Sequence, residues 1–198
     1  MSQQILWIHG GNVHKSYEDY LEFLRKREIE KEDLIGRKKW INNLQHDLGD
    51  NFEVLSPRMP CGYNAKYTNW KIWFEKFFPF LKDNIILAGG SLGGIFLAKY
   101  LSENTLPVKI KATFLLAAPH SDDYLGDFAL GDSLEKFENQ SDKIFLYHSE
   151  DDPLVNIAEI GKYSKALPKA EKVIFKDKGH FNKIKEFPEF VEKLKSLE

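Results

Sequence analysis

Short apolar runs alternate along the chain with longer segments whose apolar residues recur at helical spacing. Each run is four to six residues long and apolar nearly throughout, which is typical of strands that are covered on both faces. The runs occupy residues 4–8, 52–56, 84–88, 112–117, 143–147 and 172–175. The pattern therefore predicts six strands.

The segments between these runs carry apolar residues at i, i+3, i+4 and i+7, which predicts helices. The predicted helices cover residues 17–24, 40–48, 70–81, 92–104, 157–167 and 187–194. Ser16 and Asp19 form a capping pair before the first helix, and Pro79 should end or bend the third. The alternation of strands and helices predicts an α/β fold. We expect a three-layer sandwich, with a mostly parallel six-stranded sheet between helices on both faces.

Two of the predicted helices carry aromatic side chains at helical spacing. These are Tyr17 and Tyr20 in the first helix, and Trp70, Trp73 and Phe77 in the third. The rings could line a hydrophobic acyl pocket. The spacing is more typical of a helix face that packs on a core, so we expect core positions.

Length and composition limit the class of protein. A chain of 198 residues, with 42% hydrophobic and 29% charged residues, fits one globular domain spanning residues 1–198. Its 28 basic and 30 acidic residues exclude a protein built around a broad basic face for nucleic acid. Residues 25–39 hold seven basic and four acidic residues, a mixture that favours a solvated helix end and loop over a nucleic-acid contact.

The chain shows no signal for a membrane, a disulfide or a metal. No window approaches the apolar length of a membrane span. Cys61 is the only cysteine, so it can form neither an intramolecular disulfide nor a thiolate metal site. We therefore expect a cytoplasmic protein without a cofactor or metal.

The most informative motif is Gly89-Gly90-Ser91-Leu92-Gly93, which joins an apolar strand to an apolar helix. This is the G-x-S-x-G pattern of a nucleophile elbow, in the strand–turn–helix context that its mechanism requires. The turn is tight, so the positions two before and two after the serine need glycine. Two other glycine-rich motifs do not fit this segment. A dinucleotide-binding fingerprint would need glycine at position 91, which is Ser91, and a P-loop would need a lysine directly after its last glycine, whereas the first lysine here is Lys99.

A serine nucleophile needs a general base, and the base needs an orienting acid. Asp152 follows the strand at 143–147, and His180 follows the strand at 172–175. The C-terminal ends of parallel strands share one edge of a sheet, so these groups should meet near Ser91. The order and the spacing, 61 residues and then 28, predict a Ser91–Asp152–His180 triad.

Three other carboxylates compete for the role of the acid. Asp151 precedes Asp152, and Asp122 and Asp123 follow the strand at 112–117. We prefer Asp152 because Pro153 directly after it fixes the turn.

The loop after the first strand, His9-Gly10-Gly11-Asn12, is suited to an oxyanion hole. We expect the backbone N–H groups of Gly11 and Leu92 to form it, with His9 shaping the loop. The other imidazoles form no metal-binding pair; they are His14, His46, His120 and His148. Cys61 lacks an elbow, so we expect a loop or pocket residue and not a nucleophile.

Together these motifs resemble those of the α/β-hydrolases, and more narrowly the small serine hydrolases related to retinoblastoma-binding protein 9. The matching pieces are Pro57-Arg58-Met59-Pro60 followed by Trp70, the Gly-Gly-Ser-Leu-Gly-Gly elbow, residues 149–155 and Gly179-His180-Phe181. The resemblance implies a minimal α/β-hydrolase domain without the two N-terminal strands of larger members. It also implies a hydrolase that cleaves an ester or related acyl bond of a small molecule through an acyl-enzyme. The segment at 17–39 is longer than this group needs.

A second function remains open, because the same fold also hosts binding modules with weak or vestigial activity. Thioesterases, amidases and acyltransferases would use the same triad. Specificity should come from the segments at 12–39, 59–66 and 120–141, and two of these, 12–39 and 120–141, could form a lid. The sequence determines neither the substrate nor the oligomeric state.

Overall fold

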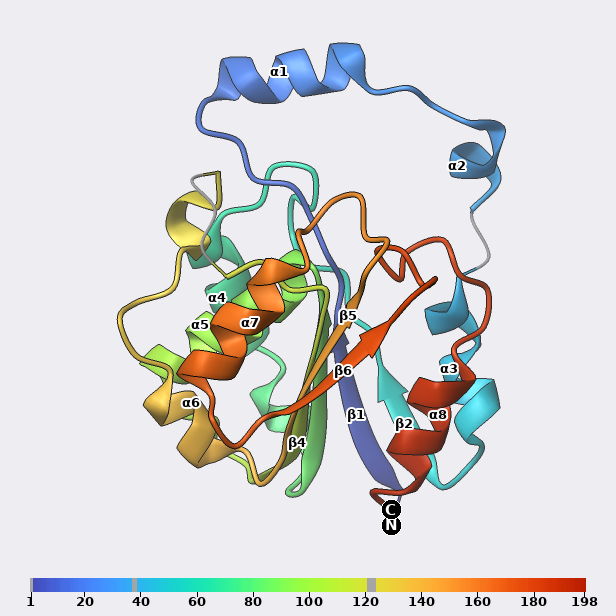
Figure 1. Ribbon diagram of the computed structural model, residues 1–198, viewed down its shortest axis with the longest axis vertical. Coiled ribbons are helices and arrows are strands. Elements are labelled where there is room, and N and C mark those ends of the chain that lie inside the picture. Colours follow the sequence, from blue (N-terminus) through green and yellow to red (C-terminus); the bar gives the residue numbers. More distant parts are fainter. Residues whose placement is uncertain (1, 37–38, 121–123) are drawn as a thin grey trace.

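The structure, a computed structural model, describes residues 2–36, 39–120 and 124–198 (Figure 1). Its sheet has six strands, all parallel, in the order β2-β1-β3-β4-β5-β6. The strands are β1 (Gln3–Ile8), β2 (Phe52–Leu55), β3 (Ile85–Gly90), β4 (Ile110–Leu116), β5 (Ile144–Ser149) and β6 (Glu171–Phe175). The six predicted strands are confirmed, each within two residues at either end.

Eight α-helices and two short 3₁₀ helices lie in the described part of the chain. The α-helices are α1 (Tyr17–Lys26), α2 (Lys31–Ile35), α3 (Trp40–Leu48), α4 (Tyr67–Glu75), α5 (Leu92–Glu103), α6 (Glu135–Gln140), α7 (Ala158–Ala166) and α8 (Pro188–Lys195). The 3₁₀ helices are η1 (Phe78–Phe80) and η2 (Gly126–Phe128). The predicted helix at 70–81 is wrong in extent, because α4 ends at Glu75 and Pro79 lies within η1. The sequence pattern missed α2 and α6, since helices of five and six residues are too short to show a period.

Side chains alternate between the two faces of each strand, so the sheet separates two apolar cores, one on each face. On β1, Leu6 and Ile8 face one core and Ile5 and Trp7 face the other. The first core includes residues of α4, α5, α6 and α7, and the second includes residues of α3 and α8. The three-layer α/β sandwich with helices on both faces is therefore confirmed (Figure 1).

Strand β6 departs from the expectation that every strand is covered on both faces. It lies at the edge of the sheet, and Ile174 is 43% exposed. Its first residues, Glu171 and Lys172, are charged and exposed. Charged residues on an edge strand discourage pairing with a second chain.

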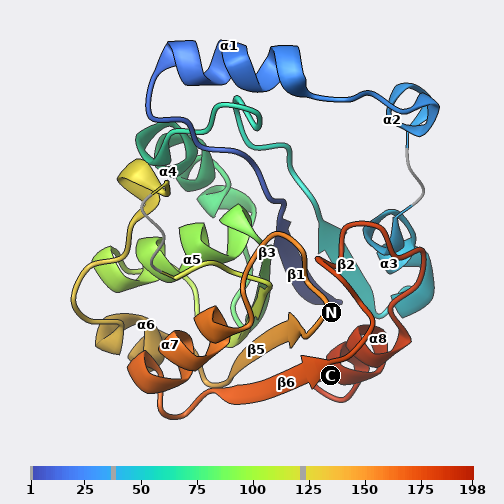
Figure 2. The same cartoon turned by 45° about the horizontal axis from the view of Figure 1, so that its top comes forward.

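Helix α1 lies beyond the C-terminal ends of the strands, apart from the two helical layers (Figures 1 and 2). None of its residues is buried, and Tyr17 is 62% exposed. The prediction of core positions is therefore wrong for Tyr17 and Tyr20. In α4 it is confirmed for Trp70, which is fully buried, and wrong for Trp73, which is 42% exposed. Periodicity identifies the apolar face of a helix but not the surface that it covers.

Candidate active site

Ser91 lies at the junction between β3 and α5, in a sharp turn of the backbone. Its φ of 53° and ψ of −122° place it outside the ordinary regions for a non-glycine residue. Backbone bonds hold the turn: Ser91 N–H donates to Leu116 O at 2.8 Å, and Gly94 N–H donates to Ser91 O at 2.9 Å. The strain is typical of a nucleophile elbow.

The glycines on either side of Ser91 are required by close backbone packing. A Cβ on Gly89 would lie 2.4 Å from the carbonyl oxygen of Gly93. A Cβ on Gly93 would lie 2.1 Å from the carbonyl oxygen of Ile8, at the end of β1. Because the colliding atoms are backbone atoms, no rotamer change could make room for a larger residue.

Asp152 and His180 come together from the loops that follow β5 and β6. His180 Nδ1 lies 2.8 Å from Asp152 Oδ2. The other carboxylate oxygen, Oδ1, accepts the backbone N–H groups of Leu154 at 2.8 Å and Val155 at 3.0 Å. The two side chains are 1% and 7% exposed, for Asp152 and His180 respectively. The carboxylate is thus held on both oxygens and shielded from water.

These contacts decide the charge of Asp152. Burial raises the pKa of its carboxyl, but hydrogen bonds from His180, Leu154 and Val155 outweigh burial and hold the pKa below its ordinary value. An ionised carboxylate only accepts hydrogen bonds, so Nδ1 of His180 carries the proton of that contact. In the neutral ring this leaves Nε2 with a free lone pair, which a general base requires.

Asp151 has a different partner, although it stands next to Asp152. Its Oδ1 accepts the hydroxyl of Ser149 at 2.5 Å and the N–H of Gly179 at 2.8 Å. The hydrogen bond from Ser149 lowers the pKa of Asp151 most, and the hydrogen bond from Gly179 lowers it further. Ser149 Oγ also accepts the N–H of Lys178 at 2.9 Å. Asp151 therefore ties the β5 loop to the backbone that precedes His180.

The loop after β1 lies beside the serine. A Cβ on Gly10 would lie 3.6 Å from Ser91 Oγ. A Cβ on Gly11 would lie 2.7 Å from the carbonyl oxygen of Gly62 and 3.1 Å from the side chain of Leu92. Gly11 and Leu92, the two residues expected to supply oxyanion N–H groups, are therefore neighbours. Leu92 is the first residue of α5, where helix N–H groups lack partners within the helix.

His9 fixes this loop through both ring nitrogens. Nδ1 donates to the carbonyl oxygen of Gly10 at 2.6 Å, and Nε2 accepts the N–H of Met59 at 2.8 Å. The ring also packs edge-on against Trp70, with the centroids 5.7 Å apart. These bonds agree with a shaping role for His9 in the loop.

His148 lies next to Asp152, a position that the sequence pattern did not indicate. Its Nε2 donates to Val155 O at 2.9 Å and lies 3.6 Å from Asp152 Oδ2, and its side chain is 1% exposed. His148 thus braces the turn that carries Asp152. An imidazole at the end of a strand, directly before an acidic loop, was the available signal.

The three predicted groups are not joined in one continuous chain of hydrogen bonds. Within residues 2–36, 39–120 and 124–198, no hydrogen bond links Ser91 Oγ to His180. Such bonds are often long in a free enzyme and close when substrate binds. The competing acids Asp122 and Asp123 lie outside the described residues.

No group of three or more His, Cys, Asp or Glu side chains among the described residues is placed to hold a metal ion. None of the described helices has both the length and the apolar character to cross a membrane.

A family model of serine hydrolases matches residues 35–198, which include the elbow, the acidic loop and His180. No curated sequence matches the chain. Solved structures share its fold at low identity. The ydeN gene product of B. subtilis is 17% identical with a TM-score of 0.79, and the match covers 99% of this chain and 98% of that one.

Two further structures match less closely. A YdeN-like hydrolase from Pectobacterium atrosepticum is 14% identical with a TM-score of 0.64, over 98% of this chain and 90% of that one. The meta-cleavage product hydrolase CumD from Pseudomonas fluorescens is also 14% identical with a TM-score of 0.64, over 99% and 90%. With its strained serine elbow and its match over residues 35–198, the chain belongs to the serine hydrolase family and has the α/β-hydrolase fold.

Proposed function

We propose that this hydrolase cleaves a carboxylic ester or a related acyl bond of a small molecule through a Ser91–His180–Asp152 triad in a single domain. The observation that carries the proposal is the buried contact of 2.8 Å between His180 Nδ1 and Asp152 Oδ2. This pair follows β5 and β6, whose C-terminal ends share the sheet edge with Ser91.

The reaction begins when Ser91 Oγ attacks the acyl carbon and His180 Nε2 takes the hydroxyl proton. The carbonyl oxygen becomes an oxyanion, which accepts hydrogen bonds from the N–H groups of Gly11 and Leu92. As the tetrahedral intermediate collapses, His180 gives its proton to the leaving group and Ser91 keeps the acyl group. Water then attacks the acyl-enzyme with His180 again as base, which releases the acid and restores the serine.

Asp152 acts through the imidazole and not on the substrate. Its lowered pKa keeps the carboxylate ionised near neutral pH, where it stabilises the imidazolium that forms in each step. Its two backbone hydrogen bonds, from Leu154 and Val155, fix the carboxylate so that Nε2 of His180 can be aimed at Ser91.

We also propose the narrower grouping with the small serine hydrolases related to retinoblastoma-binding protein 9. The support is the Gly-Gly-Ser-Leu-Gly-Gly elbow, the acidic loop at 149–155 and the Gly179-His180-Phe181 segment. The first of these segments supplies the strained serine, and the other two supply the acid and the base.

A fluorophosphonate probe tests the proposal, because it reacts with an activated serine. The wild-type protein should be labelled at pH 8, and Ser91→Ala should abolish the labelling. Labelling of Ser91→Ala, or no labelling of the wild type, would contradict the assignment. Turnover of p-nitrophenyl acetate then separates an enzyme from a binding module, since a vestigial site would be labelled but would hydrolyse the ester at the background rate.

A further inference from the structure

The backbone has a positive φ on both sides of His180. Gly179 precedes it with a φ of 53°, and Phe181 follows it with a φ of 54°. Phe181 N–H donates to the carbonyl oxygen of Lys178 at 3.1 Å, which closes the turn that carries the imidazole. Glycine adopts a positive φ freely, but phenylalanine adopts it at a cost and keeps it only where surrounding contacts hold it. The position of His180 therefore depends on the contacts that hold Phe181.

The ring of Phe181 is held in the second core. It is 4% exposed and stacks on Phe187, with the centroids 5.3 Å apart and the planes inclined by 23°. It also meets Phe175 edge-on at 5.7 Å. These contacts fix the ring, but the carbonyl group of Phe181 needs a partner of its own, because a buried carbonyl without a hydrogen bond is costly.

Trp40 supplies that partner, although it is 141 positions away in the chain. Its indole Nε1–H donates to Phe181 O at 2.8 Å in a buried hydrogen bond, and its backbone N–H donates to Ile184 O at 3.1 Å. Trp40 is the first residue of α3, where a backbone N–H has no partner within the helix. One residue thus bonds the loop at two points, the first of them directly after His180.

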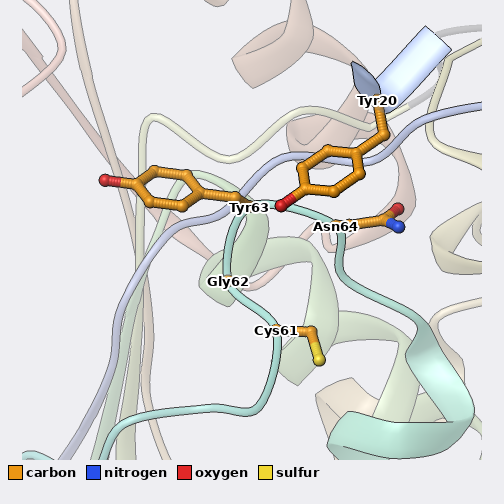
Figure 3. Close-up of a pocket in the computed structure, with 5 residues that line it drawn as sticks. All are labelled: Tyr20, Cys61, Gly62, Tyr63 and Asn64. Atoms are coloured by element: carbon orange, nitrogen blue, oxygen red, sulfur yellow. The ribbon is translucent and has the colours of Figure 1, made fainter. Parts of the chain in front are cut away.

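Trp40 is also the residue at which the chain returns to the core. None of the described residues from 9 to 39 is buried. Within this segment, Tyr20 and the turn at residues 61–64 line an open pocket on the surface (Figure 3). The segment then leads to α3, which lies beside α8 (Figures 1 and 2). A core anchor is needed here, and this need alone could explain a large apolar side chain at position 40.

The need for an anchor does not explain the indole N–H. The ring of Trp40 packs edge-on against Trp7, Phe187 and Phe190, with centroids 5.1, 5.5 and 5.2 Å away. Such packing requires an aromatic ring but no hydrogen-bond donor, so phenylalanine could provide much of it. The N–H group is what tryptophan adds, and its acceptor is the backbone beside the proposed base.

We infer that Trp40 is a positioning residue, whose indole N–H holds Phe181 at its positive φ and so orients the imidazole of His180. The hydrogen bond from Gly179 to Asp151 holds the backbone before His180, and the bond from Trp40 holds the backbone after it. A displacement of about 1 Å can cost a factor on the order of 10² in rate. The inference rests on the proposed function for the role of His180, but the position of the imidazole can be measured without turnover.

The test removes the donor and keeps the ring. Trp40→Phe lacks the indole N–H, and 3-benzothienylalanine at position 40 replaces the N–H with sulfur while keeping nearly the shape of tryptophan. Both should lower kcat for p-nitrophenyl acetate by roughly 10- to 100-fold. KM should stay within about twofold, because His180 serves acylation and deacylation alike and both steps slow together. A loss in Trp40→Phe that the benzothienylalanine protein does not show would assign the effect to packing and overturn the inference.

Leu44→Ala is the control for a general loosening of the core. Leu44 is buried in the same helix and the same core, and its apolar side chain cannot donate a hydrogen bond. The variant should unfold at a lower urea concentration than the wild type and keep its kcat within about twofold. If Leu44→Ala lowered kcat as much as the loss of the indole N–H does, the inference would be wrong.

Proton NMR measures the imidazole without turnover. The proton on His180 Nδ1, which is bonded to Asp152 Oδ2, gives a low-field signal that is assigned by its absence in His180→Gln. In both Trp40 variants this signal should disappear or exchange faster with water, whereas Leu44→Ala should keep it. An unchanged signal in the benzothienylalanine protein would overturn the inference. A wild-type protein that shows the signal but hydrolyses no ester would contradict the proposed function and not the positioning role.

Discussion

His180 Nδ1 lies 2.8 Å from Asp152 Oδ2, although the two residues are 28 positions apart and follow different strands. The neighbouring carboxylate of Asp151 lies 2.8 Å from the N–H of Gly179, the residue before His180. One acid thus bonds the imidazole, and the other bonds the backbone that carries it.

Because Asp152 bonds the imidazole of His180 and Asp151 bonds only the backbone beside it, the two carboxylates should differ in their effect on catalysis. Asp152→Asn should lower kcat by a factor on the order of 10⁴ while the protein stays folded, because an amide cannot stabilise the imidazolium and favours the wrong tautomer of His180. Steady-state kinetics with a p-nitrophenyl ester measures the loss, and a thermal melt checks the fold.

Asp151→Asn is the matched control. An asparagine oxygen can still accept from Ser149 Oγ and Gly179 N, so kcat should stay within roughly tenfold of the wild type. Asp151→Ala removes both bonds and should cost more than Asp151→Asn. We expect Asp123→Asn to stay within roughly tenfold as well. If Asp151→Asn or Asp123→Asn caused the larger loss, the acid would be misassigned.

The sequence was sufficient for the sheet and for the elbow. Buried strands such as β3 have a continuous apolar pattern, and the glycines at 89 and 93 are needed for backbone clearance that any nucleophile elbow requires. Parallel strands bring the residues after β5 and β6 to one edge, so chain order alone predicted that Asp152 and His180 would lie near each other.

Other features depend on tertiary contacts that a local pattern does not contain. The spacing of Tyr17 and Tyr20 predicts an amphipathic helix, but not that α1 leaves the core and faces a turn 40 residues away. Likewise, the sequence separates Asp152 from Asp151 only by Pro153, which follows Asp152. The structure shows that they have different partners, because Gly179 N–H donates to Asp151 and His180 donates to Asp152.

The pH dependence of catalysis should show a single acidic limb. The lowered pKa of Asp152 keeps its carboxylate ionised well below neutral pH, so that group does not limit activity between pH 5 and 8. Catalysis requires the neutral form of the imidazole base, so kcat/KM should be lower on the acidic side of the profile. A flat profile would show that histidine is not the base, and activity should be unchanged by EDTA.

His120 should contribute to the pH dependence of stability. Burial lowers the pKa of its ring in the folded state, where it packs 4.8 Å from the ring of Tyr163. The unfolded chain therefore takes up a proton first, at an ordinary pKa of about 6.5, and stability falls as the pH drops below that value. His120→Phe keeps an aromatic ring but cannot be protonated, so its free energy of unfolding should fall less steeply from pH 7 to 5.

Urea unfolding at several pH values measures this difference, which cannot exceed about 1.4 kcal/mol per pH unit for one proton. The control is His46→Phe, because the side chain of His46 is 92% exposed and its contact, Asp47 Oδ1 at 3.2 Å, is on the next residue of the chain. Equal slopes for wild type and His120→Phe would show that the buried ring does not contribute.

The elbow should tolerate no side chain at Gly93. Alanine there would bring a Cβ to 2.1 Å from Ile8 O, and the backbone of β1 cannot move away without disturbing its pairing with β3. Gly93→Ala should therefore lower the free energy of unfolding by about 3 kcal/mol or more, or prevent folding.

Gly161→Ala in α7 is the control: no atom lies within 4 Å of its Cβ, so the better helix propensity of alanine should stabilise the protein by about 0.5–1 kcal/mol. Urea unfolding of both variants measures the contrast, and a stable Gly93→Ala protein would show that β1 and the elbow are packed less closely than the structure has them.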